Sequence, residues 1–279
     1  MYNAKIITDN GFTLNLGFDY GTVFDITPLS GLDIEVSTAQ SFQQIGESVE
    51  GVSALGLTRE IYGGIIDNEK ALQEKIFKTF STFTGGKLYI GDRYCEFVTS
   101  KTPHISRGKN GRLTFLAAIF CPFPFWLDEK PSEYAFGGIT PTFHFPVIYD
   151  SHRYSIRKAV EATNCRNEGN VRQAMRIEFS TFAISRGFGL RDDTTGEFLK
   201  INAEIQGEQK VVVYQENGEI KIDYIDNGNK TNIIGNLVDK STLFELKAGD
   251  NILTPFADEG IENLNVYVSF NPAYTGVIL

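Results

Sequence analysis

The side chains that most often carry enzyme chemistry are scarce in this chain. Its 279 residues include three His, three Cys, two Met and one Trp. It has no His-Glu-x-x-His or Cys-x-x-Cys pattern, which leaves a zinc site without support. It also has no Gly-x-Ser-x-Gly elbow and no glycine-rich phosphate loop. We therefore expect no catalytic residues, no metal, no cofactor and no enzyme activity.

The cysteines give no sign of a disulfide framework. Cys95, Cys121 and Cys165 are odd in number and widely spaced, so we expect folding in a reducing environment. Cys95 and Cys121 lie in apolar surroundings and are predicted to be buried as small hydrophobic side chains.

No secretory signal or membrane span is recognisable. The first residues lack a basic stretch followed by an apolar core. The longest apolar run, residues 115–127, is too short to cross a bilayer and contains Pro122 and Pro124. These features predict a soluble protein made in a cytoplasm, without a membrane partner.

The charge is negative overall and unevenly distributed. The net charge of −9 argues against a dedicated nucleic-acid-binding protein. Residues 1–58 contain one Lys against seven acids, whereas residues 59–112 contain ten Lys or Arg against six acids. The two segments predict complementary faces between subunits, with Arg107, Lys109 and Arg112 as candidate interface residues. The alternative is that both segments are ordinary solvated surfaces and the basic loop a solvated hairpin tip.

The composition favours strands. The chain has 22 Phe, 12 Tyr and 27 Gly, and aromatic residues punctuated by glycine are typical of strands and turns. One helix is predicted over residues 68–83, with Leu72, Ile76, Phe80 and Phe83 on its apolar face. Asp67 or Asn68 is expected to cap its start, and Gly85-Gly86 to end it. The fold class is therefore mainly β, with one α-helix in the N-terminal domain.

A stiff apolar segment interrupts the strand pattern in the middle of the chain. Two prolines alternate there with large apolar side chains, and each proline removes a backbone donor. We predict that this segment joins a domain of residues 1–131 to a second domain of residues 132–279. The candidate inter-domain junction residues are Pro122, Phe123, Pro124, Phe125 and Trp126.

The second half of the chain is predicted to be all-β. Short strand-like segments alternate with turn signals, as in a sandwich or jelly roll. The expected strands are residues 143–145, 175–179, 198–201, 210–214, 219–225, 243–246 and 264–270. Residues 156–163 are the one stretch that could form a short helix. Residues 226–229 resemble a calcium loop only superficially and are better explained as a hairpin turn.

Five blocks, in order along the chain, resemble the distal tail protein (Dit) family of long-tailed bacteriophages, also called phage tail components. The proline-aromatic block is similar to the Cys-Pro-x-Pro-Phe-Trp junction of that family. The blocks are residues 59–66 (REIYGGII) with the helix after them, 86–90 (GKLYI), 121–126 (CPFPFW), 167–197 (with NEGN, IEF and TGE) and 266–277 (with VYVSF and YTGV).

This resemblance implies a structural role in a phage or prophage tail tip. The N-terminal domain would form a hexameric ring around the tail channel, and the C-terminal domain would be a galectin-like β-sandwich. The implied partners are other copies of the chain, the major tail tube protein, the tail-associated tip protein and a receptor-binding protein. The implied location is the virion, after synthesis in the bacterial host cytoplasm.

Two other function classes remain open at this point. One is a carbohydrate-binding tail protein that contacts host cell-wall polysaccharide, because sandwiches often bind sugars. A galectin's sugar-binding cluster is nevertheless not recognisable in residues 132–279. The other is an enzyme such as a tail-associated wall hydrolase. Binding on a glycan array would favour the first, and product release from purified cell walls would favour the second.

Overall fold

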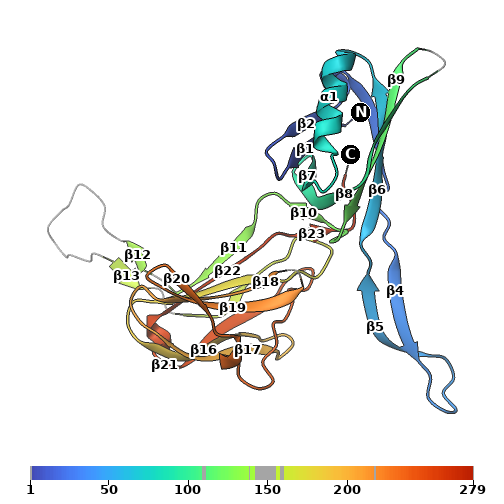
Figure 1. Cartoon of the computed structure of the whole chain (residues 1–279). Helices are drawn as coiled ribbons and strands as arrows, with labels where there is room; N and C mark the ends of the chain where they lie inside the picture. Colours follow the sequence, from blue (N-terminus) through green and yellow to red (C-terminus); the bar gives the residue numbers. More distant parts are fainter. Residues whose placement is uncertain are drawn as a thin grey trace. The chain divides into compact units, whose positions relative to one another are not determined.

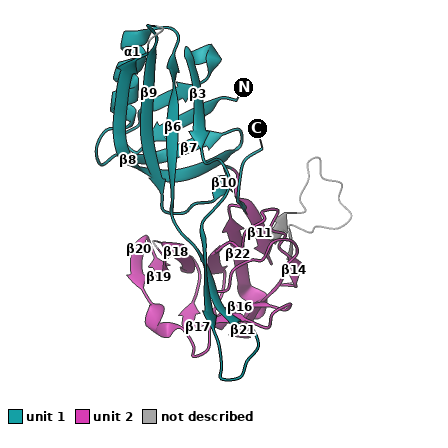
Figure 2. Ribbon diagram, turned by 90° about the vertical axis from the view of Figure 1, so that its right-hand side faces the viewer, with its two compact units in different colours: residues 1–129, 273–279 teal, residues 130–272 magenta. Residues whose placement is uncertain are grey.

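The structure is a computed structural model that describes residues 2–108, 111–137, 139–141, 155–157, 160–216 and 218–278. The chain divides into two compact units (Figure 2). Unit 1 contains Met1–Glu129 and Ala273–Leu279, and unit 2 contains Lys130–Pro272. Each unit has its own hydrophobic core.

Unit 2 is an insertion between two strands of unit 1. The strand before it, β10 (Trp126–Asp128), pairs antiparallel with the strand after it, β23 (Ala273–Tyr274). The Arg93 guanidinium donates a 2.8 Å hydrogen bond to the carbonyl oxygen of Gly276, which further fixes the returning chain. The sequence analysis places the boundary after residue 131 and leaves the whole C-terminus in the second domain. The compact units divide after residue 129 and return residues 273–279 to unit 1.

Unit 1 is built on one antiparallel sheet with the order β2-β1-β7-β8-β9-β6-β3, and β10 also pairs with β8 (Figure 1). Alternate residues of these strands point into one core. The strands are β1 (Ala4–Thr8), β2 (Thr13–Leu16), β3 (Thr22–Thr27), β6 (Leu57–Ile65), β7 (Gly85–Ile90), β8 (Arg93–Arg107) and β9 (Leu113–Cys121). A short 3-10 turn, η1 (Phe18–Tyr20), connects β2 to β3.

The predicted helix is present but shorter than expected. Helix α1 (Glu69–Thr79) contacts β1, β2 and β8 and buries Leu72 and Ile76. Asn68 adopts a left-handed conformation and makes no side-chain cap. Gly85-Gly86 does not end the helix, because both residues belong to β7. The left-handed residue after the helix is Phe83, whose side chain is exposed, so its predicted place on the buried face is wrong.

Two dipeptides that contain glycine shape the backbone of unit 1. Gly91-Asp92 is the two-residue turn between β7 and β8, since Ile90 is opposite Arg93. The pair Gly63-Gly64 marks close backbone approach, because a Cβ at Gly63 would collide with the carbonyl oxygen of Val23 on β3.

A two-stranded arm interrupts the sheet between β3 and β6. Strands β4 (Ile34–Ala39) and β5 (Ser48–Ala54) pair only with each other in a separate sheet (Figure 1). No residue from 27 to 58 is buried. Residues 33–37 alternate polar and apolar side chains, a pattern that predicts a half-buried strand. The strand exists, but its burial is wrong because nothing in the described chain covers it.

Unit 2 is a β-sandwich, as the alternating pattern predicts. One sheet has the order β11-β22-β15-β18-β19-β20 and the other β14-β21-β16-β17. The two inner faces meet in one core, where the rings of Phe179 and Phe188 lie 5.1 Å apart. The first sheet comprises β11 (Ser132–Phe136), β15 (Arg176–Thr181), β18 (Lys210–Glu216), β19 (Glu219–Asp226), β20 (Asn229–Asn232) and β22 (Leu264–Phe270).

The second sheet contains three strands that the sequence pattern missed: the two-residue β14 and the longer β16 and β21. Its members are β14 (Thr163–Asn164), β16 (Ser185–Asp192), β17 (Phe198–Ile205) and β21 (Ile252–Glu259). Short 3-10 turns η2 (Ile234–Asn236) and η3 (Ile261–Asn263) connect strands. A small hairpin of β12 (Ile139–Pro141) and β13 (Ser155–Arg157) is described by its backbone alone.

Four other expectations for unit 2 have different outcomes. Residues 243–246 form no strand and contribute one isolated bridge, between Leu246 and Gln173. Ile156 and Arg157 lie in β13, so the short helix is wrong there. Residues 226–229 are a hairpin turn, with Asp226 opposite Asn229, as predicted. The predicted strand at 143–145 lies outside the described residues.

Candidate assembly surfaces

The arm has one apolar face that no described residue covers. Val36 is directly opposite Val52, and Ile34 is opposite Ala54, so these side chains point to the same side. Beyond a register shift, Val49 is opposite Thr38 and extends the same side. Ile34, Val36, Val49 and Val52 are all more than half exposed. A two-stranded hairpin is at best marginally stable alone in water, so this face is suited to packing against a partner.

The rest of the arm is polar and carries charge of one sign. The opposite face presents Glu35, Ser37 and Ser53. The sequence contains no Lys or Arg between Lys5 and Arg59, whereas the arm contains four acids: Asp33, Glu35, Glu47 and Glu50. At the tip of the arm, the Phe42 side chain is 95% exposed. The arm is thus amphipathic, with an apolar face and an acidic character that would suit a basic neighbour.

Both ends of the arm are fixed by one buried cluster, which we call the arm root: Pro28, Leu29, Arg59, Pro124 and Trp126. Arg59 donates hydrogen bonds to the carbonyl oxygens of Pro28 and Pro124, the second at 2.8 Å. The Trp126 indole N–H donates a 2.9 Å hydrogen bond to the carbonyl oxygen of Leu29. The guanidinium lies 4.7 Å from the centre of the Trp126 ring, in cation–π contact. The arm is therefore tied to the core of unit 1 at its base.

A second exposed surface is the outer sheet face of unit 1, defined by Val23, Tyr62, Val98, Leu116 and Phe120. These residues alternate along β3, β6, β8 and β9 with residues that point into the core. Four of them are more than one third exposed, and Leu116 is half-buried. The face is therefore partly apolar.

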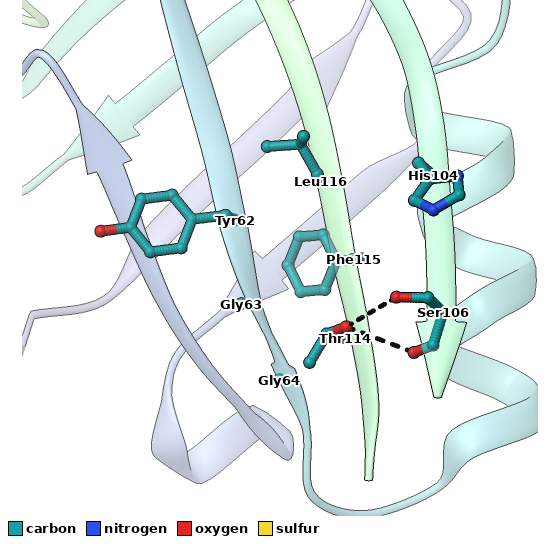
Figure 3. Close-up of a pocket in the computed structure, with 8 residues that line it drawn as sticks. All are labelled: Tyr62, Gly63, Gly64, His104, Ser106, Thr114, Phe115 and Leu116. Carbon is teal, nitrogen blue, oxygen red and sulfur yellow. Dashed lines mark hydrogen bonds between the residues drawn. The ribbon is translucent and has the colours of Figure 1, made fainter. Parts of the chain in front are cut away.

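A shallow hollow of about 450 Å³ lies on this face (Figure 3). Gly64 provides no side chain opposite Thr114, and no heavy atom lies closer than 3.8 Å to the position of its missing Cβ, which leaves the space open. At its edge, Thr114 donates a 3.2 Å hydrogen bond to the carbonyl oxygen of Ser106. The hollow brings together no pair of groups arranged for acid–base or nucleophilic chemistry, so it serves better as a packing surface.

One carboxylate organises the neighbouring part of the outer sheet face. Asp25 accepts hydrogen bonds from the hydroxyls of Tyr62 at 2.9 Å and Tyr2 at 3.0 Å. The bond from Tyr62, with that from the backbone N–H of Ile26, holds the pKa of Asp25 below its ordinary value. Asp25 is therefore ionised at neutral pH and fixes the Tyr62 ring in place.

The predicted interface residues lie at the far end of the β8–β9 hairpin. The Arg107 side chain is more than half exposed and donates a 3.0 Å hydrogen bond to Glu69 at the start of α1. Arg112 is exposed at the start of β9. Lys109 lies outside the described residues. A subunit contact through these side chains remains a prediction, and for Arg107 it would compete with the ion pair to Glu69.

The predicted junction residues all lie in unit 1, just before its boundary with unit 2. Trp126 is fully buried in the core of unit 1, and Pro124 accepts a hydrogen bond from Arg59. The Phe123 and Phe125 rings make an edge-to-face contact with centres 5.0 Å apart. The segment therefore anchors the arm root, a role that sequence reasoning missed. Two features of the sequence could have indicated this role. Trp126 is the only Trp, and Arg59 is the first basic residue after a long acidic stretch.

In the described part of the chain, no three His, Cys, Asp or Glu side chains are grouped as metal ligands would be. Among the described residues, no helix is long and apolar enough to cross a membrane. The features that stand out are thus surfaces and the arm root.

Residues 168–274 match the family described as "Siphovirus-type tail component, C-terminal domain". No curated protein matches the chain in sequence. Among solved structures, Dit of phage SPP1 aligns with 96% of this chain and 98% of its own, at 14% identity and a TM-score of 0.62. It is described as a paradigm of the hub adsorption apparatus in phages that infect Gram-positive bacteria.

A chain of the phage P2 baseplate, in its activated conformation with Ca, aligns with 99% of this chain and 100% of its own. The identity is 9% and the TM-score 0.50. At such identities these two alignments establish a shared fold. The family match adds a similarity in sequence, which lies almost entirely in unit 2. Residues 168–274 therefore match the siphovirus-type tail component family, and the chain as a whole shares the fold of the SPP1 distal tail protein.

Proposed function

We propose that this protein is a structural hub of a long-tailed phage or prophage tail tip, in which six copies form a ring through unit 1. The ring joins the tail tube protein to the tail-associated tip protein and to receptor-binding proteins. The protein is made in the host cytoplasm and functions in the virion. The SPP1 protein of the same fold, described as part of a hub adsorption apparatus, supports this role.

The observation that carries the proposal is the arm, because its apolar face has no cover within the described chain. A head-to-tail ring needs two different complementary patches on each subunit. The apolar face of the arm is one patch, and a surface on the neighbouring copy is the other. The arm's acids suit the basic segment 59–112, which includes Arg107 and Arg112.

The first test measures assembly directly. Full-length protein is sized by light scattering and imaged in negative stain, alone and with its tail neighbours. We expect closed rings. The double variant Val36→Thr/Val52→Thr keeps strand propensity but makes the apolar face polar, and we expect it to lose most of the ring population.

The opposite face of the arm provides a matched control. Ser37→Thr/Ser53→Thr introduces the same residue type on the polar side, and we expect full assembly. Equal assembly by the two double variants would reject the arm as the contact. Strictly monomeric wild-type protein, even beside its tail neighbours, would reject the ring.

The basic patch is tested separately. Reversal of charge in Arg107→Glu/Arg112→Glu is expected to weaken the ring, and the effect should fall with added salt. Glu69→Gln removes the ion pair to Arg107 without changing the patch, and we expect it to leave assembly intact. An unchanged ring in the charge-reversed variant would exclude these side chains from the contact.

A further inference from the structure

Two buried thiols lie in contact in unit 1. Cys95 is on β8 and Cys121 ends β9, and their Sγ atoms are 3.8 Å apart. Both side chains are fully buried. A disulfide bond is about 2.05 Å long, so a movement of less than about 2 Å would close the bond. Cys165 in unit 2 is equally buried, but its thiol has no second thiol beside it.

A buried positive charge adjoins the two thiols. Arg59 is fully buried, and its hydrogen-bond partners are two neutral carbonyl groups of the arm root. Its Nε atom is buried without a hydrogen-bond partner, and the described residues include no carboxylate paired with it. Burying a charge without an opposite charge is costly, so the site calls for an anion.

Cys121 is the group that can supply this negative charge. The hydrogen bond from Cys95, together with the Arg59 charge, lowers the pKa of Cys121 to about 7. The same contact with Cys121, followed by burial, raises the pKa of Cys95 well above its ordinary value. The described titratable and charged groups that act on Cys121 are therefore Arg59 on β6 and Cys95 on β8.

We propose that Cys95 and Cys121 are an oxidisable dithiol in which Arg59 stabilises a Cys121 thiolate, and that a peroxide converts the pair into a disulfide. The inference concerns the interior of unit 1 and does not depend on the proposed function. Closure would join β8 covalently to the end of β9, beside the arm root.

The chemistry balances with hydrogen peroxide as the oxidant. The Cys121 thiolate attacks one peroxide oxygen, the O–O bond breaks, and hydroxide leaves, which gives a sulfenic acid. The sulfur of Cys95 then attacks the sulfenic sulfur, the S–S bond forms, and the S–O bond breaks as water leaves with the Cys95 proton. The peroxide is reduced by two electrons, which the two sulfurs supply.

The main experiment counts free thiols in the full-length protein. Reduced protein is treated with hydrogen peroxide, freed of it, and then unfolded in N-ethylmaleimide for mass spectrometry. We expect one adduct in place of three, at Cys165, and a reducible link between the peptides of Cys95 and Cys121. In Cys95→Ser, we expect Cys121 to stop at the sulfenic acid, which dimedone traps.

Cys165 is the matched control within the chain. Cys165→Ser should form the same disulfide and then show no adduct. Three adducts in the oxidised wild-type protein, preferential oxidation of Cys165, or a disulfide between two copies would each overturn the proposal. Circular dichroism of each variant confirms that the comparison is made between folded proteins.

The rate at which the Cys95–Cys121 pair is oxidised tests the role of Arg59. Arg59→Gln removes the charge, so at neutral pH we expect oxidation of the pair to slow about tenfold, with the midpoint of its pH profile raised. A merely structural role predicts the opposite, since a loosened fold exposes thiols and speeds their oxidation.

The thiolate can also be measured without changing Arg59. Absorbance near 240 nm at pH 8 should be higher in the wild type and in Cys165→Ser than in Cys121→Ser. Equal absorbance in all three would overturn the assignment of the thiolate, whether or not Arg59→Gln folds.

Discussion

The two units distribute apolar and charged side chains in opposite ways. Unit 1 exposes the apolar face of its arm and buries Arg59. Unit 2 encloses most of its apolar residues between two sheets and keeps ion pairs such as Arg186–Glu204 on its exposed surface. A unit that leaves apolar surface uncovered gains from a partner, whereas a closed sandwich is complete by itself. This difference supports the proposal that copies assemble through unit 1.

The largest expected effect comes from the arm root. Trp126→Ala removes a buried indole and its hydrogen bond to Leu29, so the free energy of unfolding of unit 1 should fall by about 3–5 kcal/mol. Hydrogen exchange, which reports each unit separately, should show lost protection in unit 1 and unchanged protection in unit 2. Phe188→Ala, in the unit 2 core, should give the reverse pattern. Loss of protection in both units from either variant would show that they unfold together.

A smaller effect separates the packed sheet from the free arm. Gly63→Ala places a methyl group against the backbone of Val23, so we expect a loss of roughly 1–3 kcal/mol in chemical denaturation. Gly51→Ala on β5 meets nothing within 4 Å, so its stability should change by less than about 1 kcal/mol. A large loss from Gly51→Ala would mean that the arm is packed in solution.

Two of the buried thiols, Cys121 in unit 1 and Cys165 in unit 2, contribute to stability with opposite pH dependence. Burial raises the pKa of Cys165 to about 12. Its contribution to the free energy of unfolding of unit 2 is therefore full below the ordinary pKa of 9.0 and is lost as the pH rises from 9.0 towards 12. The pKa of Cys121 is lowered, so its contribution is full above 9.0 and is lost as pH falls through about 7.

These contributions should be on the order of 1 kcal/mol each. Hydrogen exchange followed from pH 7 to 10 is the measurement for each unit. Cys165→Ala should reduce the loss of stability that unit 2 shows at alkaline pH. Cys121→Ser should remove the gain in stability that unit 1 shows between pH 7 and 9. The same pH response in both variants would contradict the assignment.

The smallest expected effect concerns the exposed charges of unit 2. Arg186 contacts Glu204 at 2.6 Å and Glu259 at 2.7 Å, but it is about half exposed. Exposed ion pairs contribute little, so Arg186→Met should shift the denaturation midpoint only slightly, and less again in high salt. Arg59→Met should cost several times more, because it leaves carbonyl groups of the arm root without a donor. Similar losses from the two variants in denaturant titrations would remove the contrast between the units.

The local chemistry of turns and alternation was readable from the sequence. Gly91-Asp92 fixes a hairpin by its own backbone preferences, and Leu72 and Ile76 mark a helix face by spacing alone. The strands β16 and β21 escaped notice because Gly187, Gly189 and Pro255 disrupt the usual composition of a strand. Their strand state depends on pairing with each other, which is a property of the folded chain.

The candidate surfaces were less predictable. The alternation around Val36 indicates a strand with one apolar face, and only the fold shows that no described residue covers it. The arm root depends on contacts between residues far apart in sequence, such as Arg59 with Pro124, and no local pattern encodes these. The basic residues Arg107 and Arg112 were found by charge alone, since charge remains visible in any conformation.

Because unit 2 is inserted between two strands of unit 1, it could be exchanged as a whole for another domain. Trp126 and Tyr274 are directly opposite each other in β10 and β23, so the chain leaves unit 1 and re-enters it at neighbouring points. A sandwich of another size or surface could be inserted between β10 and β23 without moving the backbone of unit 1 around these two strands. Such an architecture would let the inserted sandwich diverge in sequence while the frame of unit 1 kept its geometry.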